Sequence, residues 1–153
     1  MGIVEAGQDA PEFSLQTADA GAPFTRAALL GATTVLVFYP FAFSPVCTDQ
    51  LSLYDELRAD FAAQGATLLG VSCDAHYSQS AFKRQLGIAM PQLSDFEPKG
   101  ATCRAFGVLH PDGFPQRALV LIDGAGVVRW SHQAASPGEL PGANLIFDAL
   151  ARL

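Results

Sequence analysis

Residues 35–50 read VLVFYPFAFSPVCTDQ and decide the fold of the chain. The run that ends at Tyr39 is apolar, β-branched and aromatic, which predicts a buried strand. Pro40 interrupts this strand, and a helical pattern begins after Pro45 and continues to about Ala63. The stretch is therefore a strand, a loop and a helix in immediate succession, as in an α/β domain.

Cys47 falls in the first turn of that helix, just beyond the carboxyl end of the strand. Open α/β sheets place their ligand sites at this edge. A helix N-terminus also presents unpaired N–H groups and a partial positive charge, which favour a thiolate. Cys47 is thus the candidate nucleophile. The alternative is a buried structural thiol, because free cysteines are often buried.

Length and composition indicate one globular domain spanning residues 1–153. Half of the residues are hydrophobic and the mean hydropathy is +0.24, so the chain can bury a core and disorder is not expected. The net charge of −6 and the absence of a Lys/Arg cluster argue against nucleic-acid binding. No apolar run approaches about 20 residues and no signal sequence is recognisable, which predicts a cytoplasmic protein that does not span a membrane.

Three cysteines occur without CxxC or CxxH spacing. This low, odd count argues against a disulfide framework and against a structural zinc site. The three histidines add no ligand spacing, so we expect neither a metal nor a cofactor. A cytosolic protein with at least one reactive thiol fits the cysteine usage better.

Periodicity and turn residues predict the rest of the chain. The expected strands are 12–15, 23–25, 33–39, 66–73, 90–94, 117–123 and 127–133, with a turn at 18–21; the expected helices are 26–30, 46–63, 78–86, 99–106 and 143–153. This order predicts an α/β thioredoxin-like fold, with a mixed central sheet flanked by helices and an N-terminal β-hairpin extension before the main sheet.

Apolar residues mark the expected buried face of the helix at 46–63. They are Val46, Leu51, Leu53, Leu57 and Phe61.

The spacing Pro40-x-x-x-Ser44-x-x-Cys47 resembles the PxxxT/SxxC signature of the peroxiredoxin family. Its context is similar over nearly the whole chain, because GVSCD at 70–74, LSD at 93–95 and AFGV at 105–108 resemble family segments. Among peroxiredoxins the chain looks most like the small AhpE-type and bacterioferritin-comigratory-type members.

The resemblance implies a peroxidase in which the Cys47 thiolate attacks hydrogen peroxide or an organic hydroperoxide and becomes a sulfenic acid. Ser44 would place its hydroxyl beside the sulfur and the peroxide. Arg117, which opens the strand 117–123 where the family keeps an arginine, would stabilise the thiolate and orient the transition state. Pro40 would shield the pocket from water.

Two further residues support this expected site. The backbone N–H of Val46 would donate to the peroxide together with that of Cys47. Gln50, where family members carry Glu or Gln, would hydrogen-bond around the arginine. The alternatives are that Ser44 only caps the helix and that Arg117 lies on the surface.

Reduction of the sulfenic acid is the open question. The resolving position five residues after the nucleophile is Ser52 here, so that local disulfide is impossible. We favour a one-cysteine mechanism with an external reductant, either a small thiol or a thioredoxin-like or mycoredoxin-like protein. Cys103, expected to be solvent-accessible, is the alternative resolving residue, and Cys73, at the end of a buried strand, is a weaker one.

The family expectation for assembly is a homodimer packed around the active-site loops. The apolar side chains of Phe41 and Phe43 in that loop line the pocket or a dimer surface, and favour organic hydroperoxides slightly. Two other functions remain open. A thiol–disulfide oxidoreductase is weakly supported, because the position three after Cys47 is Gln50. A non-enzymatic redox-sensing or partner-binding module would use the same sulfenic acid without turnover.

Overall fold

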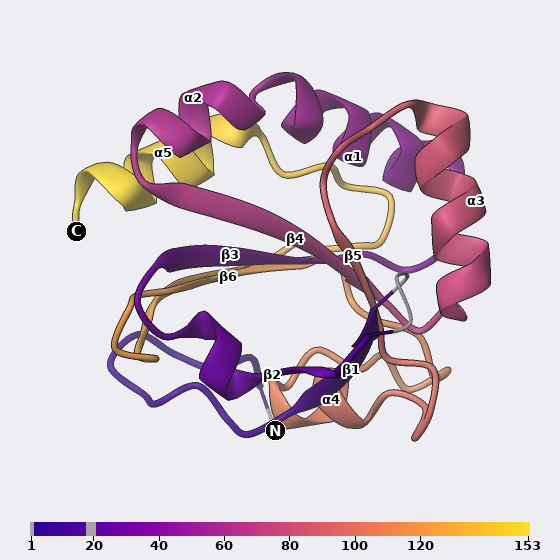
Figure 1. Ribbon diagram of the computed structural model, residues 1–153, viewed down its shortest axis with the longest axis horizontal. Helices are drawn as coiled ribbons and strands as arrows, with labels where there is room; N and C mark the ends of the chain where they lie inside the picture. Colours follow the sequence, from indigo (N-terminus) through magenta and orange to yellow (C-terminus); the bar gives the residue numbers. More distant parts are fainter. Residues whose placement is uncertain (1, 18–20) are drawn as a thin grey trace.

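The computed structural model describes residues 2–17 and 21–153, and these form one mixed sheet with helices on both faces (Figure 1). Seven strands of the described residues join in the order β2-β1-β5-β4-β3-β6-β7. They are β1 (Ser14–Thr17), β2 (Phe24–Thr25), β3 (Thr33–Phe38), β4 (Ala66–Ser72), β5 (Gln92–Ser94), β6 (Ala118–Ile122) and β7 (Val128–Gln133).

The helices divide between the two faces of this sheet (Figure 1). They are the 3-10 helix η1 (Arg26–Leu29) and the α-helices α1 (Pro45–Glu56), α2 (Arg58–Ala63), α3 (His76–Leu86), α4 (Ala101–Ala105) and α5 (Ala143–Ala151). In Figure 1, α1, α2, α3 and α5 cover one face, whereas η1 and α4 lie on the other. In the part of the chain that the structure describes, no helix has the length and apolar composition needed to cross a membrane.

β3 is an interior strand of the sheet, with β4 on one side and β6 on the other. β3 runs parallel to β4, which is parallel to β5, and antiparallel to β6. The register pairs Phe38 of β3 with Ala118 of β6. The loop after β3 therefore lies beside the start of β6, and residues far apart in the sequence meet there.

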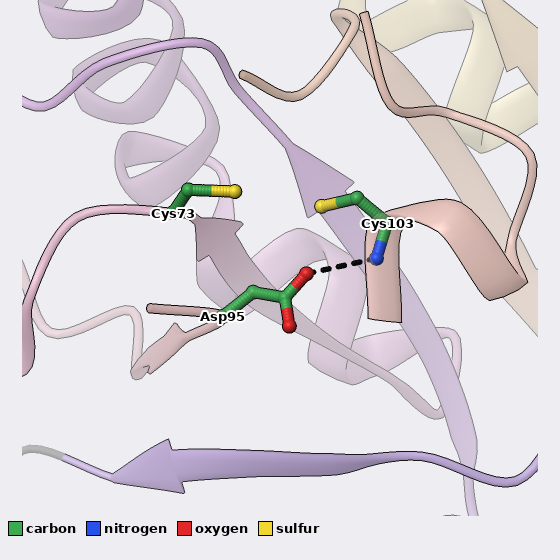
Figure 2. Close-up of side chains that lie close together, drawn as sticks. All are labelled: Cys73, Asp95 and Cys103. Carbon is green, nitrogen blue, oxygen red and sulfur yellow. Dashed lines mark hydrogen bonds between the residues drawn. The ribbon is translucent and has the colours of Figure 1, made fainter. Parts of the chain in front are cut away.

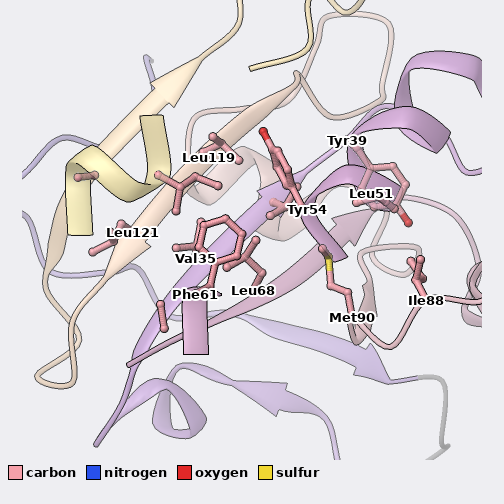
Figure 3. Packing of buried hydrophobic residues seen from close by; sticks show 14 of the residues in the cluster. Val35, Tyr39, Leu51, Tyr54, Phe61, Leu68, Ile88, Met90, Leu119 and Leu121 are labelled. Atoms are coloured by element: carbon pink, nitrogen blue, oxygen red, sulfur yellow. The ribbon is translucent and has the colours of Figure 1, made fainter. Parts of the chain in front are cut away.

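Two hydrophobic clusters sandwich the sheet, because alternate residues of each strand face opposite sides. The first core lies under α1, α2, α3 and α5, and Figure 3 shows part of it. It includes Val35, Val37, Tyr39, Cys47, Leu51, Tyr54, Phe61, Leu68, Leu119, Leu121 and Ile146. The second core lies on the opposite face, and includes Leu15, Leu36, Phe38, Val71, Leu93, Cys103, Phe106, Val120 and Val128.

The predicted order of elements and the mixed sheet flanked by helices are confirmed. The predicted N-terminal hairpin is present, because β1 pairs antiparallel with β2, and β1 also pairs with β5, so the hairpin extends one edge of the main sheet. Of the predicted turn at 18–21, residues 18–20 lie outside the described residues. The single helix predicted at 46–63 is two helices, because the backbone of Leu57 leaves helical geometry between α1 and α2.

The predicted buried face of α1 is partly wrong. Val46 is half-buried and Leu53 is 37% exposed. The residues that α1 buries are Cys47, Gln50, Leu51 and Tyr54. These four residues follow the helical repeat, but Gln50 and Tyr54 carry polar groups, so a search for apolar residues does not find them.

Candidate active site

Cys47 is the third residue of α1, and its side chain is fully buried in the first core. Ser44 occupies the N-cap position, and Pro45 begins the helix with a ring that needs no N–H partner. The first helical hydrogen bond joins the N–H of Thr48 to the carbonyl of Ser44 at 2.9 Å. The N–H groups of Val46 and Cys47 lie before this bond, so they remain available to an oxygen beside the sulfur.

Arg117 reaches Cys47 from the strand beside β3. It directly precedes β6 and lies two residues before Leu119, which faces the first core, so the strand repeat points Arg117 toward the same face. The arginine is only 2% exposed. Its Nη2 donates to Sγ of Cys47 at 3.2 Å. A permanent positive charge therefore lies against the sulfur in a buried site.

The remaining donors of the guanidinium are held in place by fixed partners. Nε of Arg117 donates to the carbonyl of Pro137 at 2.8 Å, and Nη1 donates to Oε1 of Gln50 at 2.5 Å. Gln50 in turn donates to the Tyr54 hydroxyl at 3.3 Å, and that hydroxyl donates to the carbonyl of Pro141 at 2.6 Å. This network fixes the direction in which Arg117 points.

Tyr54 is the member of this network that the sequence analysis missed. Burial raises the pKa of its phenol, while the hydrogen bond from Gln50 and the charge of Arg117 oppose that shift. The hydroxyl therefore stays protonated and serves as a donor. Its helical spacing, four residues after Gln50 and seven after Cys47, was the available signal.

Ser44 and Pro40 lie in the segment between β3 and Cys47, and among the described residues neither makes a hydrogen bond to the sulfur. The Ser44 hydroxyl donates to the carbonyl of Phe41 at 3.1 Å, and it does not bond to a helix N–H. Pro40 is buried just beyond the end of β3. Side-chain capping by Ser44 is therefore not observed, and the hydroxyl lies on the loop that precedes Cys47.

That loop carries two exposed aromatic side chains. Phe41 is 49% exposed and Phe43 is 47% exposed. Phe43 has a φ of 71°, a left-handed conformation that is strained for a bulky residue. A hydrogen bond from the backbone N–H of Ala42 to Oδ2 of Asp74, at 2.8 Å, anchors the loop.

The other two cysteines lie away from Arg117. The prediction that Cys103 is solvent-accessible is wrong, because α4 packs it into the second core, where it is fully buried. Cys73 follows the end of β4 and is partly buried against that same core. Cys47 belongs to the core on the opposite face of the sheet. The two thiols considered as resolving residues thus lie close to each other, at the core opposite the one that contains Cys47.

Chemically, this arrangement combines a thiol with groups that can stabilise negative charge. The thiol at the helix N-terminus faces a buried guanidinium, and two open N–H groups lie beside it. Such a site stabilises a thiolate and also an oxygen that gains charge when it leaves.

Comparison with known proteins gives consistent results. The AhpC/TSA family model matches residues 6–131. Over 152 residues the chain is 29% identical to alkyl hydroperoxide reductase E of Mycobacterium tuberculosis, covering 99% of each chain.

Solved structures agree with this match. Peroxidoxin BcpB from Mycobacterium tuberculosis has a TM-score of 0.84 at 25% identity, over 98% of each chain. Mycobacterium tuberculosis AhpC has a TM-score of 0.85 at 22% identity, over 97% of this chain and 92% of its own. The predicted thioredoxin-like architecture is confirmed by this likeness.

Proposed function

The chain belongs to the AhpC/TSA family and is a peroxiredoxin, a thiol-dependent peroxidase, and from this premise we propose that Cys47 is the thiol that attacks the peroxide. The observation that carries the proposal is the 3.2 Å contact between Nη2 of Arg117 and Sγ of Cys47. Among the three cysteines, only Cys47 accepts a hydrogen bond from an arginine within the described residues.

The proposed reaction is a displacement at oxygen. The Cys47 thiolate forms a bond to one peroxide oxygen as the O–O bond breaks. The sulfur is oxidised to a sulfenic acid, and the other oxygen leaves and takes a proton, as water from hydrogen peroxide or as an alcohol from an organic hydroperoxide.

Ionisation of the thiol explains only part of the rate that such a site provides. A thiol of ordinary pKa, about 8.5, is a few per cent ionised at pH 7, so full ionisation gains at most roughly thirtyfold. Nucleophilicity also falls as a thiol becomes more acidic. The site must therefore stabilise charge on the departing oxygen and align it with the sulfur.

Arg117 supplies most of that stabilisation in this proposal. The bonds from Nε to Pro137 and from Nη1 to Gln50 hold the guanidinium in place before the peroxide arrives, so little reorganisation is needed. The open N–H groups of Val46 and Cys47 complete the set of donors, and the Ser44 hydroxyl, whose proton goes to the Phe41 carbonyl, offers its oxygen as an acceptor. Pro40 limits the access of water to the sulfur.

We further propose a one-cysteine mechanism in which an external thiol reduces the sulfenic acid. The placement of Cys103 in the second core supports this, because a disulfide with Cys47 needs Cα atoms within about 7 Å. Ser52 occupies the nearby resolving position and has no thiol. The reductant is a small thiol or a thioredoxin-like or mycoredoxin-like protein.

The test is the intact mass of the reduced protein after one equivalent of peroxide, with and without a reagent that traps sulfenic acids. We expect a gain of one oxygen atom that peptide mapping assigns to Cys47. A peptide that joins Cys47 to another cysteine would replace the one-cysteine mechanism by a two-cysteine one. Cycling over many turnovers with added thiol distinguishes a peroxidase from a redox sensor, which reacts once.

A further inference from the structure

Cys73 and Cys103 form a pair of thiols on the face of the sheet opposite Cys47. Their sulfur atoms and a carboxylate oxygen of Asp95 all lie within 4.8 Å of one another. Figure 2 shows the two sulfurs pointing toward each other from the end of β4 and from α4. The residues are 30 positions apart in the sequence, so the fold brings them together.

The two thiols differ in exposure and in acidity. Cys73 is partly exposed, whereas Cys103 is fully buried. The neighbouring Cys103 thiol lowers the pKa of Cys73, and the nearby ammonium of Lys99 acts in the same direction, whereas burial and the carboxylates of Asp95 and Asp74 oppose this shift. The neighbouring Cys73 thiol, together with burial and the Asp95 carboxylate, raises the pKa of Cys103. One thiol is thus accessible and more acidic, and its neighbour keeps a proton to donate.

A cavity of about 350 Å³ gives solutes a route to Cys73. Its walls include Cys73, Lys99, Phe41 and Phe114. Phe41 belongs to the loop before Cys47, and its ring packs 5.0 Å from that of Phe114. Arg117 is not among the residues that line this cavity.

We propose that Cys73 and Cys103 are a second redox-active pair, which a hydroperoxide converts into an intramolecular disulfide independently of Cys47. Cys73 attacks the peroxide and becomes a sulfenic acid, with release of water or an alcohol. The Cys103 sulfur then attacks the Cys73 sulfur, and the departing hydroxyl takes the Cys103 proton and leaves as water. Each disulfide thus consumes one peroxide and oxidises two thiols.

The environment favours a disulfide over a bound cation at these three residues. Both carboxylate oxygens of Asp95 already accept backbone N–H groups, from Thr102 at 3.1 Å and from Cys103 at 2.8 Å. These bonds fix Asp95 at the start of α4, and the Lys99 ammonium adds positive charge near Cys73. Only three ligands gather here among the described residues, whereas structural zinc sites use four.

The test uses the Cys47→Ser variant, which removes the proposed peroxidatic thiol and leaves the pair intact. Reduced protein is treated with excess hydrogen peroxide and digested with trypsin without reductant. The lysine and arginine positions place each cysteine in its own peptide, at 27–58, 59–83 and 100–104. We expect peptides 59–83 and 100–104 joined, with a loss of two hydrogens from the intact chain, and the same joined peptides from the wild-type protein.

Two double variants test the proposed direction of the reaction. In Cys47→Ser/Cys103→Ser, Cys73 should gain one oxygen that a sulfenic-acid trap captures. In Cys47→Ser/Cys73→Ser, folded Cys103 should keep a free thiol, because its side chain is fully buried. Circular dichroism checks that both variants are folded.

Three results would overturn the proposal. The first is a free Cys73 thiol in oxidised, folded Cys47→Ser protein. The second is separate oxidation of both thiols to oxygenated acids without joined peptides. The third is stoichiometric retention of Zn²⁺ by the reduced variant in the presence of a chelator, which would make the cluster a metal site. Because Cys47 is absent, none of these results bears on its assignment as the peroxidatic thiol.

Discussion

Replacing Arg117 with methionine removes the charge beside Cys47 and keeps a side chain of similar length. The structure makes this the most informative change, because Arg117 is 2% exposed and its guanidinium contacts the sulfur directly. We expect the second-order rate constant for oxidation of Cys47 by peroxide to fall by about 100- to 1,000-fold, as for loss of an oxyanion-site donor.

The magnitude follows from the 3.2 Å separation of Nη2 and Sγ. At an effective dielectric constant of about 20, Coulomb's law gives roughly 5 kcal/mol for two unit charges at this distance. A hydrogen bond to a charged group contributes less in net terms, about 1.5–3 kcal/mol, because both groups are desolvated. Ionisation of an ordinary thiol accounts for at most about 2 kcal/mol, or roughly thirtyfold. A loss beyond thirtyfold therefore reports stabilisation of the departing oxygen.

The assay is competition with a peroxide-consuming indicator enzyme, followed from neutral to alkaline pH. Thiolate absorbance at each pH gives the ionised fraction separately. We expect alkaline conditions to recover only the ionisation part of the loss. Arg117→Lys keeps the positive charge but cannot reproduce all three hydrogen bonds of the guanidinium, to Cys47, Gln50 and Pro137. It should retain more activity than Arg117→Met. The exposed Arg129→Met is the matched control and should oxidise at the wild-type rate.

The reasoning would be refuted by an Arg117→Met variant, folded by circular dichroism, whose rate stays within about threefold of the wild type. Full recovery at alkaline pH would refute the transition-state part alone. Thermal unfolding must accompany these measurements, because the carbonyl of Pro137 and Oε1 of Gln50 lose their donor, at a cost of about 1–3 kcal/mol each.

Three other expected outcomes concern the site and the stability of the chain. Cys47→Ser should abolish the rapid, repeated peroxide consumption that depends on added thiol and leave only the single equivalent taken up by the proposed Cys73–Cys103 pair. Cys103→Ser should leave the oxidation rate of Cys47 unchanged in competition kinetics; the reverse pattern would exchange their roles. Gln50→Leu should slow oxidation of Cys47 about tenfold, because Arg117 loses the hydrogen-bond acceptor that orients it. Gln50→Glu keeps an acceptor and should retain most of the rate, and equal losses in both variants would contradict the idea that Gln50 positions Arg117. Several hydrogen bonds hold the pKa of Asp123 below its usual range, and the largest effect comes from the backbone N–H of Val127. The ionised carboxylate therefore stabilises the folded chain above about pH 4, and this contribution is lost as the pH falls through the pKa of the folded state. Asp123→Asn should therefore lower the thermal midpoint near neutral pH and match the wild type in acid, and a pH-independent difference would exclude this linkage.

Much of this arrangement is predictable from the sequence, because local pattern determines it. The apolar strand, Pro45 and the helical repeat place Cys47 in the first turn of α1. The strand repeat through Leu119 points Arg117 toward the same face. In these short segments, hydrophobic periodicity and turn residues together predict where the elements begin and which face each residue occupies.

Long-range contacts are not readable in the same way. Tyr54 escaped the sequence analysis because a buried polar residue breaks the apolar pattern, and its partner, the Pro141 carbonyl, is far along the chain. The pairing of Cys73 with Cys103 depends on how α4 packs against the end of β4, which no spacing rule specifies. The exposure of Cys103 was also predicted wrongly, because a helix as short as α4 has too few residues to show which of its faces is buried.

The two cores have a consequence for the stoichiometry of oxidation. Cys47 and the pair lie in cores on opposite faces of the sheet. If both proposals hold, no disulfide links the two faces, and the chain should behave as two independent redox couples. A titration of fully reduced protein should consume one equivalent of peroxide at Cys47 and a second at the pair, and only the first should be returned quickly by an external thiol.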